Sequence, residues 1–373
     1  MLYFRSITAA LVAVLGATPG IAAEYNANHF FAERHSLVLG PYVEFADKVA
    51  EATNGEIIFR VFSGGSLVPA NASLQGVRDG VSHVTYHAGT YTSAELPVEN
   101  LISNMVFYNT DPMVLALAST EFSMTNDQAL AEWRKNGVVF GGGYATPEYK
   151  LMCNKPIETL IDLEGKRIRD PGGAWSRFTE FVNAVPVSIP SSEMYTGLDT
   201  GALDCNMSPG DALVSFSLHD VVTHMNTLAI GNYFSGFLWG YNTTFWQNLT
   251  DEQRSVLLQQ MAHSLVEGQV AYSAAAQSAI DDARESGMAI SEPDEALKAA
   301  LARFAEADQA TLLDTARDRG VDNPEEILEE FKDIIDRWDD LLNGVDRTNV
   351  EAIVEIAKAQ LYNKIDSSTY GID

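Results

Sequence analysis

The first third of the chain alternates between two spacings of hydrophobic residues. Apolar residues recur at helical spacing from Leu39 to Ala50, and Gly55 then provides a natural C-terminal stop. Residues 56–62, rich in Ile, Phe and Val, predict a strand, residues 73–80 a short helix, and residues 81–86 another strand. Strands and helices that alternate in this way predict a parallel sheet covered by helices on both faces.

The same alternation returns after three consecutive glycines, Gly141–Gly143. A helix is predicted at residues 174–184, among strands at 150–153, 166–169, 185–189 and 203–206. These elements predict a second sheet and therefore an α/β fold with two lobes. The glycine-rich joint and a second crossing near Ser235–Gly236 predict the hinge strands between the lobes.

From about Asp251 onward the pattern becomes helical. Apolar residues three and four apart run from Ile327 to Leu342, and acidic residues occupy the opposite side. This spacing predicts an amphipathic helix whose acidic side faces water. Its apolar side could pack onto the helix's own lobe, which we favour, or pair with a second copy of the chain.

Residues 1–23 have the features of a signal peptide. A single charge at Arg5 precedes an apolar run from Ile7 to Gly16, and Ile21-Ala22-Ala23 resembles a cleavage site. The run is too short to span a bilayer, and no later stretch approaches eighteen uncharged apolar residues. We therefore expect an exported protein whose mature chain is not inserted in a membrane. No cysteine follows the run, so we expect no lipid anchor.

The composition excludes several classes of binding partner and of scaffold. The formal net charge is −27, which repels nucleic acid and anionic lipid, so any site for an anion must depend on a few local cations. Only two cysteines occur, Cys153 and Cys205, which excludes a disulfide-rich scaffold and a cysteine-rich metal cluster. In an oxidising compartment they form either one bridge or two buried thiols.

Motifs for catalysis are absent from the sequence. The glycine runs at Gly64-Gly65 and Gly141–Gly143 lack the spacing of a phosphate loop or a dinucleotide fingerprint. His83 and His87 lie on a predicted strand and its loop, where a four-residue step does not make a metal pair. No nucleophile elbow or HExxH motif occurs. We expect a protein that is not an enzyme and that holds no cofactor and no metal.

Arg169 is the strongest candidate for a binding residue. It ends a predicted strand just before a loop containing Pro171 and Gly172, and ligands of open α/β folds lie outside the carboxyl ends of strands. A guanidinium at this place can clamp a planar carboxylate with two hydrogen bonds, which a lysine cannot do. The alternative is a surface arginine paired with Glu164 or Asp170.

Four motifs resemble those of the solute-binding proteins of tripartite ATP-independent periplasmic (TRAP) transporters. This family is similar to the C4-dicarboxylate-binding protein. The four motifs occur in the family's order, and the similarity covers roughly residues 24–330. The motifs are DLEGKRIRDPG at 162–172, SEMYTGLDTGALD at 192–204, YNTTFWQNL at 241–249, and TNG at 53–55 followed by GSL at 65–67 and LQGVRDG at 74–80.

The resemblance implies the periplasmic binding protein fold: two lobes, hinge strands and C-terminal helices. We expect lobe one at residues 24–146 plus about 236–275, lobe two at 147–235 plus about 276–330, and a helical extension at 331–373. The family's strand order would place the strand of Cys153 beside that of Cys205, so a bridge is possible. The implied function is capture of a small organic acid in the periplasm and delivery to a membrane permease.

The resemblance also implies positions for the ligand-binding residues. Arg169 would clamp the carboxylate, Ser208 replaces the family's assisting asparagine, and Tyr149 lies where the family often has another arginine or polar residue. Other candidates follow strands or lie near the crossings, and for each aromatic among them core packing is the alternative: His29, Phe30, His87, Tyr91, Trp175, Phe234 and Trp239.

One placed cation and aromatic walls predict a monocarboxylate with an apolar or ring-bearing tail. Three alternative functions remain open at this point: the binding protein of an ATP-driven importer, a secreted enzyme of unknown class, and a ligand-sensing partner of a membrane receptor.

Overall fold

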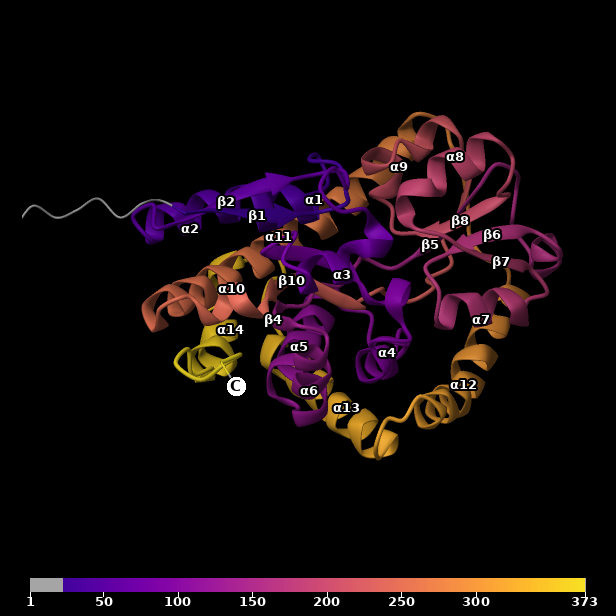
Figure 1. Cartoon of the computed structure of the whole chain (residues 1–373). Helices are drawn as coiled ribbons and strands as arrows, with labels where there is room; N and C mark the ends of the chain where they lie inside the picture. Colours follow the sequence, from indigo (N-terminus) through magenta and orange to yellow (C-terminus); the bar gives the residue numbers. More distant parts are fainter. Residues whose placement is uncertain (1–22, 373) are drawn as a thin grey trace, which may run out of the picture.

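The computed structural model describes residues 23–372, which form two α/β lobes side by side (Figure 1). The predicted signal peptide therefore lies outside the described residues except for Ala23. Within residues 23–372, none of the helices combines the length and the apolar character that a bilayer span requires.

The first lobe is built on a five-stranded sheet in the order β2-β1-β3-β10-β4. The strands β1, β2 and β3 are parallel, and α2 and α3 connect them. The helix before β2 stops where Asn54 and Gly55 take positive φ angles, as the Gly55 stop predicts. The strands of this sheet are β1 (Ala23–Asn28), β2 (Ile57–Phe62), β3 (Val84–Ala88), β4 (Val138–Gly142) and β10 (Gly236–Asn242).

The second lobe contains a six-stranded sheet in the order β11-β9-β5-β8-β6-β7. Its strands lie within a residue or two of the predicted ones, apart from the short β9 and β11, which the sequence pattern did not reveal. The strands are β5 (Lys150–Cys153), β6 (Arg167–Asp170), β7 (Val185–Ser188), β8 (Cys205–Ser208), β9 (His224–Asn226) and β11 (Ala289–Ser291).

Both sheets are mixed, so the prediction of a parallel sheet in the first lobe holds for β1, β2 and β3 but not for β10. The strand β10 runs antiparallel to β3 and β4, and β5 runs antiparallel to β8 and β9. Each of these is the first strand after the chain crosses between lobes. A strand that enters from the lobe boundary runs away from it, whereas strands of β-α-β units end at it.

Helices cover the sheets and connect the lobes. The longest, α11, contacts α2 and α5 of the first lobe and α9 of the second, while α12 and α13 pass along the outside from one lobe to the other (Figure 1). The helices are α1 (Ser36–Val38), α2 (Phe45–Ala52), α3 (Ser73–Arg78), α4 (Pro97–Ser103), α5 (Pro112–Thr125), α6 (Asp127–Lys135), α7 (Ala174–Phe181), α8 (Met194–Asp199), α9 (Ala212–Ser215), α10 (Thr243–Gln247), α11 (Asp251–Glu285), α12 (Glu295–Asp318), α13 (Pro324–Leu342) and α14 (Val350–Gln360).

The amphipathic helix predicted near the C-terminus is α13, and its apolar side packs on α5 of the first lobe. Phe331 meets Phe122 of α5, with ring centroids 5.5 Å apart, and Trp338 is fully buried. The apolar side is thus covered within the chain, which is the arrangement that we favoured from the sequence.

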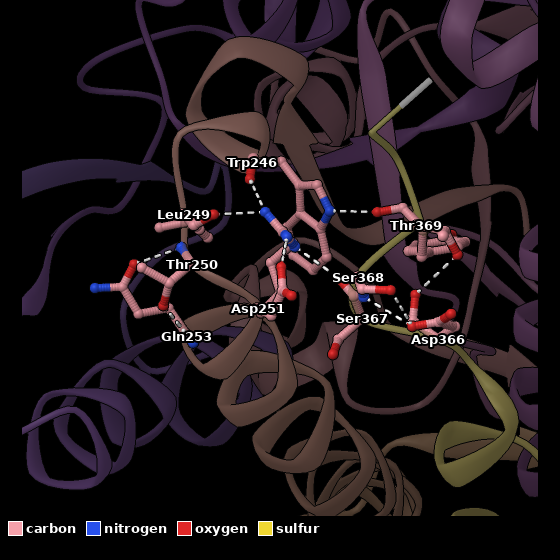
Figure 2. Close-up of polar contacts among 11 residues, drawn as sticks. Trp246, Leu249, Thr250, Asp251, Gln253, Asp366, Ser367, Ser368 and Thr369 are labelled. Atoms are coloured by element: carbon pink, nitrogen blue, oxygen red, sulfur yellow. Dashed lines mark hydrogen bonds and ion pairs between the residues drawn. The ribbon is translucent and has the colours of Figure 1, made fainter.

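The last residues are fastened to the first lobe by a buried arginine. Arg254 of α11 donates from Nε to the Ser367 carbonyl at 2.6 Å, and from Nη1 to the Leu249 carbonyl at 2.5 Å. Trp246 Nε1 donates to the Tyr370 carbonyl at 2.7 Å. Figure 2 shows Ser367, Ser368 and Thr369 beside Trp246 and the start of α11. The C-terminal segment is therefore part of the lobe's packed structure.

Cys153 and Cys205 face each other in the antiparallel pair β5–β8 and form a disulfide. The two alternatives left open by the sequence are thus decided by strand pairing. The bridge closes a loop with a sequence separation of 52 residues, which contains Arg169 and all of β6 and β7.

Glu99 of α4 reaches the second crossing between the lobes. Its carboxyl group accepts hydrogen bonds from the Gly236 backbone N–H at 2.6 Å and from Ser235 Oγ at 3.1 Å. Gly236 has φ +90°, and a Cβ there would lie 2.1 Å from the His87 carbonyl, so this position requires glycine. Burial raises the pKa of Glu99 to about 8, against the opposing effect of the Gly236 hydrogen bond.

We predict that removing the disulfide destabilises the protein without changing its fold. By the chain-entropy model, a loop of this size contributes about 3–4 kcal/mol to the free energy of unfolding. Urea unfolding of a Cys153→Ala/Cys205→Ala variant should give a free energy of unfolding lower by about that amount. Reductant should lower the free energy of unfolding of the wild type and leave that of the variant unchanged. Two alkylated thiols found by mass spectrometry in unreduced, periplasm-purified wild type would contradict the bridge.

We also predict that Glu99→Gln weakens the pH dependence of stability. Folded chains hold the Glu99 proton up to a pH of about 8, whereas unfolded chains release it near 4.5. The stability that the protonated group provides is therefore full at low pH and lost as the pH rises through this window. Each proton taken up on folding changes the free energy of unfolding by up to about 1.4 kcal/mol per pH unit.

Urea unfolding across this window should show the wild type losing stability relative to the Gln variant as the pH rises. Glu95→Gln, at an exposed position four residues earlier, is the matched control and should parallel the wild type. If the free energies of unfolding of Glu99→Gln and the wild type changed with pH in parallel, the raised pKa of Glu99 would be refuted.

Candidate ligand-binding site

A cavity of about 40 Å³ lies between the lobes, where the carboxyl ends of β1, β3, β6 and β8 meet. Its lining includes ends of strands, both crossings between the lobes, and the long helix α11. The lining residues are Phe30, Phe31, His35, Tyr86, Ala88, Tyr91, Thr146, Tyr149, Arg169, Pro171, Ser191, Met194, Ser208, Pro209, Asp211, Ala212, Phe216, Tyr233 and Tyr272.

Arg169 lies at the end of β6 with a relative exposure of 2%. Its Nε donates to the Ile189 carbonyl at 3.0 Å and its Nη1 to the Met207 carbonyl at 3.3 Å. These bonds fix the plane of the guanidinium, and the Tyr149 hydroxyl also lies within its hydrogen-bonding reach. The N–H groups at the outer end that remain unbonded can donate to a ligand. That end-on fork matches the two oxygens of a carboxylate.

The guanidinium has no carboxylate partner within 4.0 Å among residues 23–372. Asp170, one of the two partners considered from the sequence, instead accepts from the Gly172 N–H at 2.8 Å and from Ser188 Oγ at 2.9 Å. Glu164, the other, is exposed. The surface ion pair is therefore not formed, and a buried cation lines the cavity.

A larger cavity of about 180 Å³ lies nearby, between α4, α7 and α12, and it also contains arginines. Its Arg177 is paired with Asp308, with Nε 2.6 Å from Oδ1 and Nη2 2.6 Å from Oδ2. Its other arginine, Arg319, is exposed and donates to the Ser93 carbonyl at 3.1 Å. Because one guanidinium is neutralised and the other is in water, the smaller cavity with the buried Arg169 is the better candidate for binding an anion.

Ser208 ends β8 and lines the cavity beside Asn206. Asn206 Nδ2 donates to Ser208 Oγ at 2.5 Å, while the Ser208 hydroxyl has Met152 Sδ as its acceptor at 3.8 Å. Sulfur is a weak acceptor, so the hydroxyl hydrogen of Ser208 can turn toward a ligand oxygen.

Aromatic rings form the walls. Tyr149 and Tyr233 come from the two crossings, lie nearly parallel with centroids 6.4 Å apart, and both contact Trp175. Burial raises the pKa of Tyr149, and the charge of Arg169 opposes that rise, which places the hydroxyl beside the guanidinium. On the first lobe, Phe30 meets Tyr86 with centroids 5.0 Å apart.

Five of the ten residues predicted from the sequence line this cavity. They come from both lobes and from the first crossing: Arg169, Ser208, Tyr149, Phe30 and Tyr91. That they contact a ligand remains a prediction.

The other five are not part of the lining. His29 stacks on Tyr86 at 4.4 Å, and His87 is held between Ser73 Oγ and Thr92 Oγ1 at 2.8 and 2.7 Å. The ring of His29 is thus packed inside the protein and its Nδ1 accepts from the Phe31 N–H at 3.1 Å, although its Nε2 has no hydrogen-bond partner among the described residues. Both ring nitrogens of His87 are engaged inside the protein.

Trp175 lies behind the wall and donates from Nε1 to the Ile230 carbonyl at 2.7 Å. Trp239 donates to the Pro41 carbonyl at 2.9 Å, and Phe234 packs toward Phe331. The indole N–H of each tryptophan thus binds a backbone carbonyl away from the cavity.

Sequence reasoning missed several lining residues. Asp211 follows Ser208 by three positions, so the rule that ligands meet strand ends could have found it. His35 faces it from the other lobe, with Nε2 3.5 Å from Asp211 Oδ2. Burial raises the pKa of Asp211 to about 7 and lowers that of His35 to about 3. Tyr272 comes from the middle of α11, where no local signal marks it.

Contacts between the lobes surround the cavity. The Ser191 N–H donates to the Tyr91 hydroxyl at 3.0 Å, and Arg34 Nη2 donates to Ser217 Oγ at 2.9 Å. Entry of an organic acid into a cavity of about 40 Å³ would require the lobes to move apart. Any ligand would then be held by groups from both lobes.

Comparison with known proteins places this geometry in a family. The family model described as bacterial extracellular solute-binding protein, family 7, matches residues 27–312. A solute-binding protein of Albidiferax ferrireducens is 25% identical over 200 residues, covering 52% of this chain and 56% of that protein. The 2,3-diketo-L-gulonate-binding periplasmic protein YiaO of Escherichia coli is 26% identical over 186 residues, covering 48% and 54%. The chain thus spans about half the length of the curated relatives it matches.

Solved structures show the same fold. A TRAP periplasmic solute-binding protein of Bordetella bronchiseptica with bound (R)- and (S)-mandelate has a TM-score of 0.71 at 22% identity, covering 84% of this chain and 99% of that one. A marine metagenome TRAP solute-binding protein specific for aromatic acids, in complex with 3-hydroxybenzoate, has a TM-score of 0.77 at 21% identity, covering 86% and 99%. The resemblance to TRAP solute-binding proteins is therefore confirmed: the chain belongs to family 7 of the bacterial extracellular solute-binding proteins.

Proposed function

We propose that this protein captures a small organic monocarboxylate in the periplasm and delivers it to the membrane permease of a TRAP transporter. The observation that carries the proposal is the buried Arg169, unpaired with any carboxylate among the described residues, in a cavity between two lobes. The predicted signal peptide supports the periplasmic location. Membership of a family of binding proteins supports capture without chemistry, and the permease as partner.

The lining supports one carboxylate rather than two. Among the described residues that line the cavity, Arg169 is the one arginine or lysine. Lys150 lies outside the lining, with Nζ 3.4 Å from Glu148 and 3.3 Å from the Thr227 carbonyl. A second buried carboxylate without a cation is costly. Relatives with bound mandelate or 3-hydroxybenzoate support a monocarboxylate with a ring.

We predict that Arg169 provides much of the affinity. A thermal-shift panel of mandelate, 3-hydroxybenzoate, benzoate and pyroglutamate should identify a ligand, and calorimetry should then give its affinity. Arg169→Ala should weaken binding about 10- to 100-fold, because a charged hydrogen bond contributes about 1.5–3 kcal/mol. Arg169→Lys should also bind weakly, because the planar fork is lost.

Arg167→Ala is the matched control, since Arg167 lies on the same strand, is exposed, and pairs with Asp204. It should bind like the wild type. Wild-type affinity in folded Arg169→Ala, or a panel without any stabilising acid, would contradict the proposal.

We also predict that one ligand binds per chain and draws the lobes together. The two crossings and the contacts around the cavity require an opening motion for entry. Small-angle scattering of the ligand-free protein should give a larger radius of gyration than scattering at saturation with the acid identified above. An unchanged radius at saturation would count against hinge closure.

A further inference from the structure

The cavity contains buried polar atoms that Arg169 does not explain. Three lining residues each have one side-chain atom without a hydrogen-bond partner among the described residues: Asp211 Oδ1, His35 Nε2 and Ser191 Oγ. All three side chains are more than nine-tenths buried. Unpaired buried polar atoms are costly and rare, so a cluster of them on one cavity indicates a ligand group that pairs with them.

Asp211 has one oxygen held within the protein. This oxygen, Oδ2, accepts from Ser215 Oγ at 2.9 Å, one turn later on α9. No donor among residues 23–372 meets hydrogen-bond geometry at Oδ1, although the Tyr272 hydroxyl lies close enough to the carboxyl group to oppose the rise of its pKa. A carboxyl oxygen is an acceptor whether or not the group is ionised, so Asp211 offers an acceptor in either state.

His35 faces Asp211 as a neutral donor. Its Nδ1 accepts the Leu37 backbone N–H at 3.1 Å, so the hydrogen of the neutral ring is on Nε2. Burial lowers the pKa of His35 to about 3, which keeps the ring neutral at physiological pH. The Nε2–Oδ2 distance of 3.5 Å is too long for a good hydrogen bond, so the two residues do not satisfy each other.

We propose that Asp211, with His35 beside it, forms a second polar subsite that accepts a hydrogen bond from an O–H or N–H group of the ligand. The subsite selects carboxylic acids that carry such a donor over otherwise similar acids that lack it. This inference rests on the proposed function, because Arg169 binds the carboxylate of the ligand while Asp211 accepts the hydrogen bond from its O–H or N–H group. Discrimination arises since an acid without the donor leaves buried Oδ1 unpaired.

The test compares matched pairs of acids that differ in the donor: 3-hydroxybenzoate with benzoate, mandelate with phenylacetate, and pyroglutamate with cyclopentanecarboxylate. Calorimetry on the wild type should show a preference of about tenfold or more for the donor-bearing acid in at least one pair. Asp211→Ala and Asp211→Leu should bring that ratio to about one by weakening the donor-bearing acid alone. The exposed Asp199, at the end of α8, provides the control Asp199→Ala, which should keep the ratio.

Equal binding of both members of every pair by the wild type would overturn the subsite while leaving carboxylate capture intact. Equal weakening of both members by the Asp211 variants would also overturn it, since Asp211 would then act in lobe closure. Failure of all six acids to bind the wild type would overturn the proposed function and the subsite together. Arg169→Lys separates the two roles, because it should weaken both members of a pair alike.

Discussion

The candidate site depends on a buried guanidinium whose charge the protein only partly compensates. Removing a cation from water is costly, and a buried arginine normally has a carboxylate partner. Arg169 instead has two backbone carbonyls, from Ile189 and Met207. These acceptors orient the group without neutralising it. The remaining charge favours an anion in the cavity, and the low local dielectric strengthens that attraction.

The path of the chain determines which groups meet this charge. Strands of β-α-β units end at the lobe boundary, whereas the strands that follow each crossing, β5 and β10, begin there. Residues just after β1, β3, β6 and β8 are therefore brought to one cavity, and the two crossings contribute Tyr149 and Tyr233. The same segments must separate to admit a ligand, so binding and lobe movement involve the same residues.

The strong negative charge of the chain and an anion site are compatible because they act at different ranges. Interactions between exposed charges are screened beyond about 10 Å at moderate salt, so the acidic surface opposes an approaching anion weakly. The proposed contact of an anion with Arg169 would be short and shielded from water, because Arg169 is buried. The acidic side of α13 remains in solvent, where it favours solubility rather than binding.

The sequence by itself determined many of the local elements and the family, and it predicted Arg169 as the carboxylate clamp. Hydrophobic spacing placed five of the eleven described strands within a residue or two, because side-chain period is a local property of helices and strands. The run around Arg169 singled out the arginine, and four motifs in order identified the family. Only the tertiary structure decided the antiparallel β5 and β10, the Cys153–Cys205 bridge and the separation of cavity-lining aromatics such as Phe30 from core aromatics such as Trp239. The tertiary structure also places His35 of one lobe beside Asp211 of the other. Each of these depends on residues far apart in the chain, and the spacing of residues along a sequence does not specify which distant segments pack together.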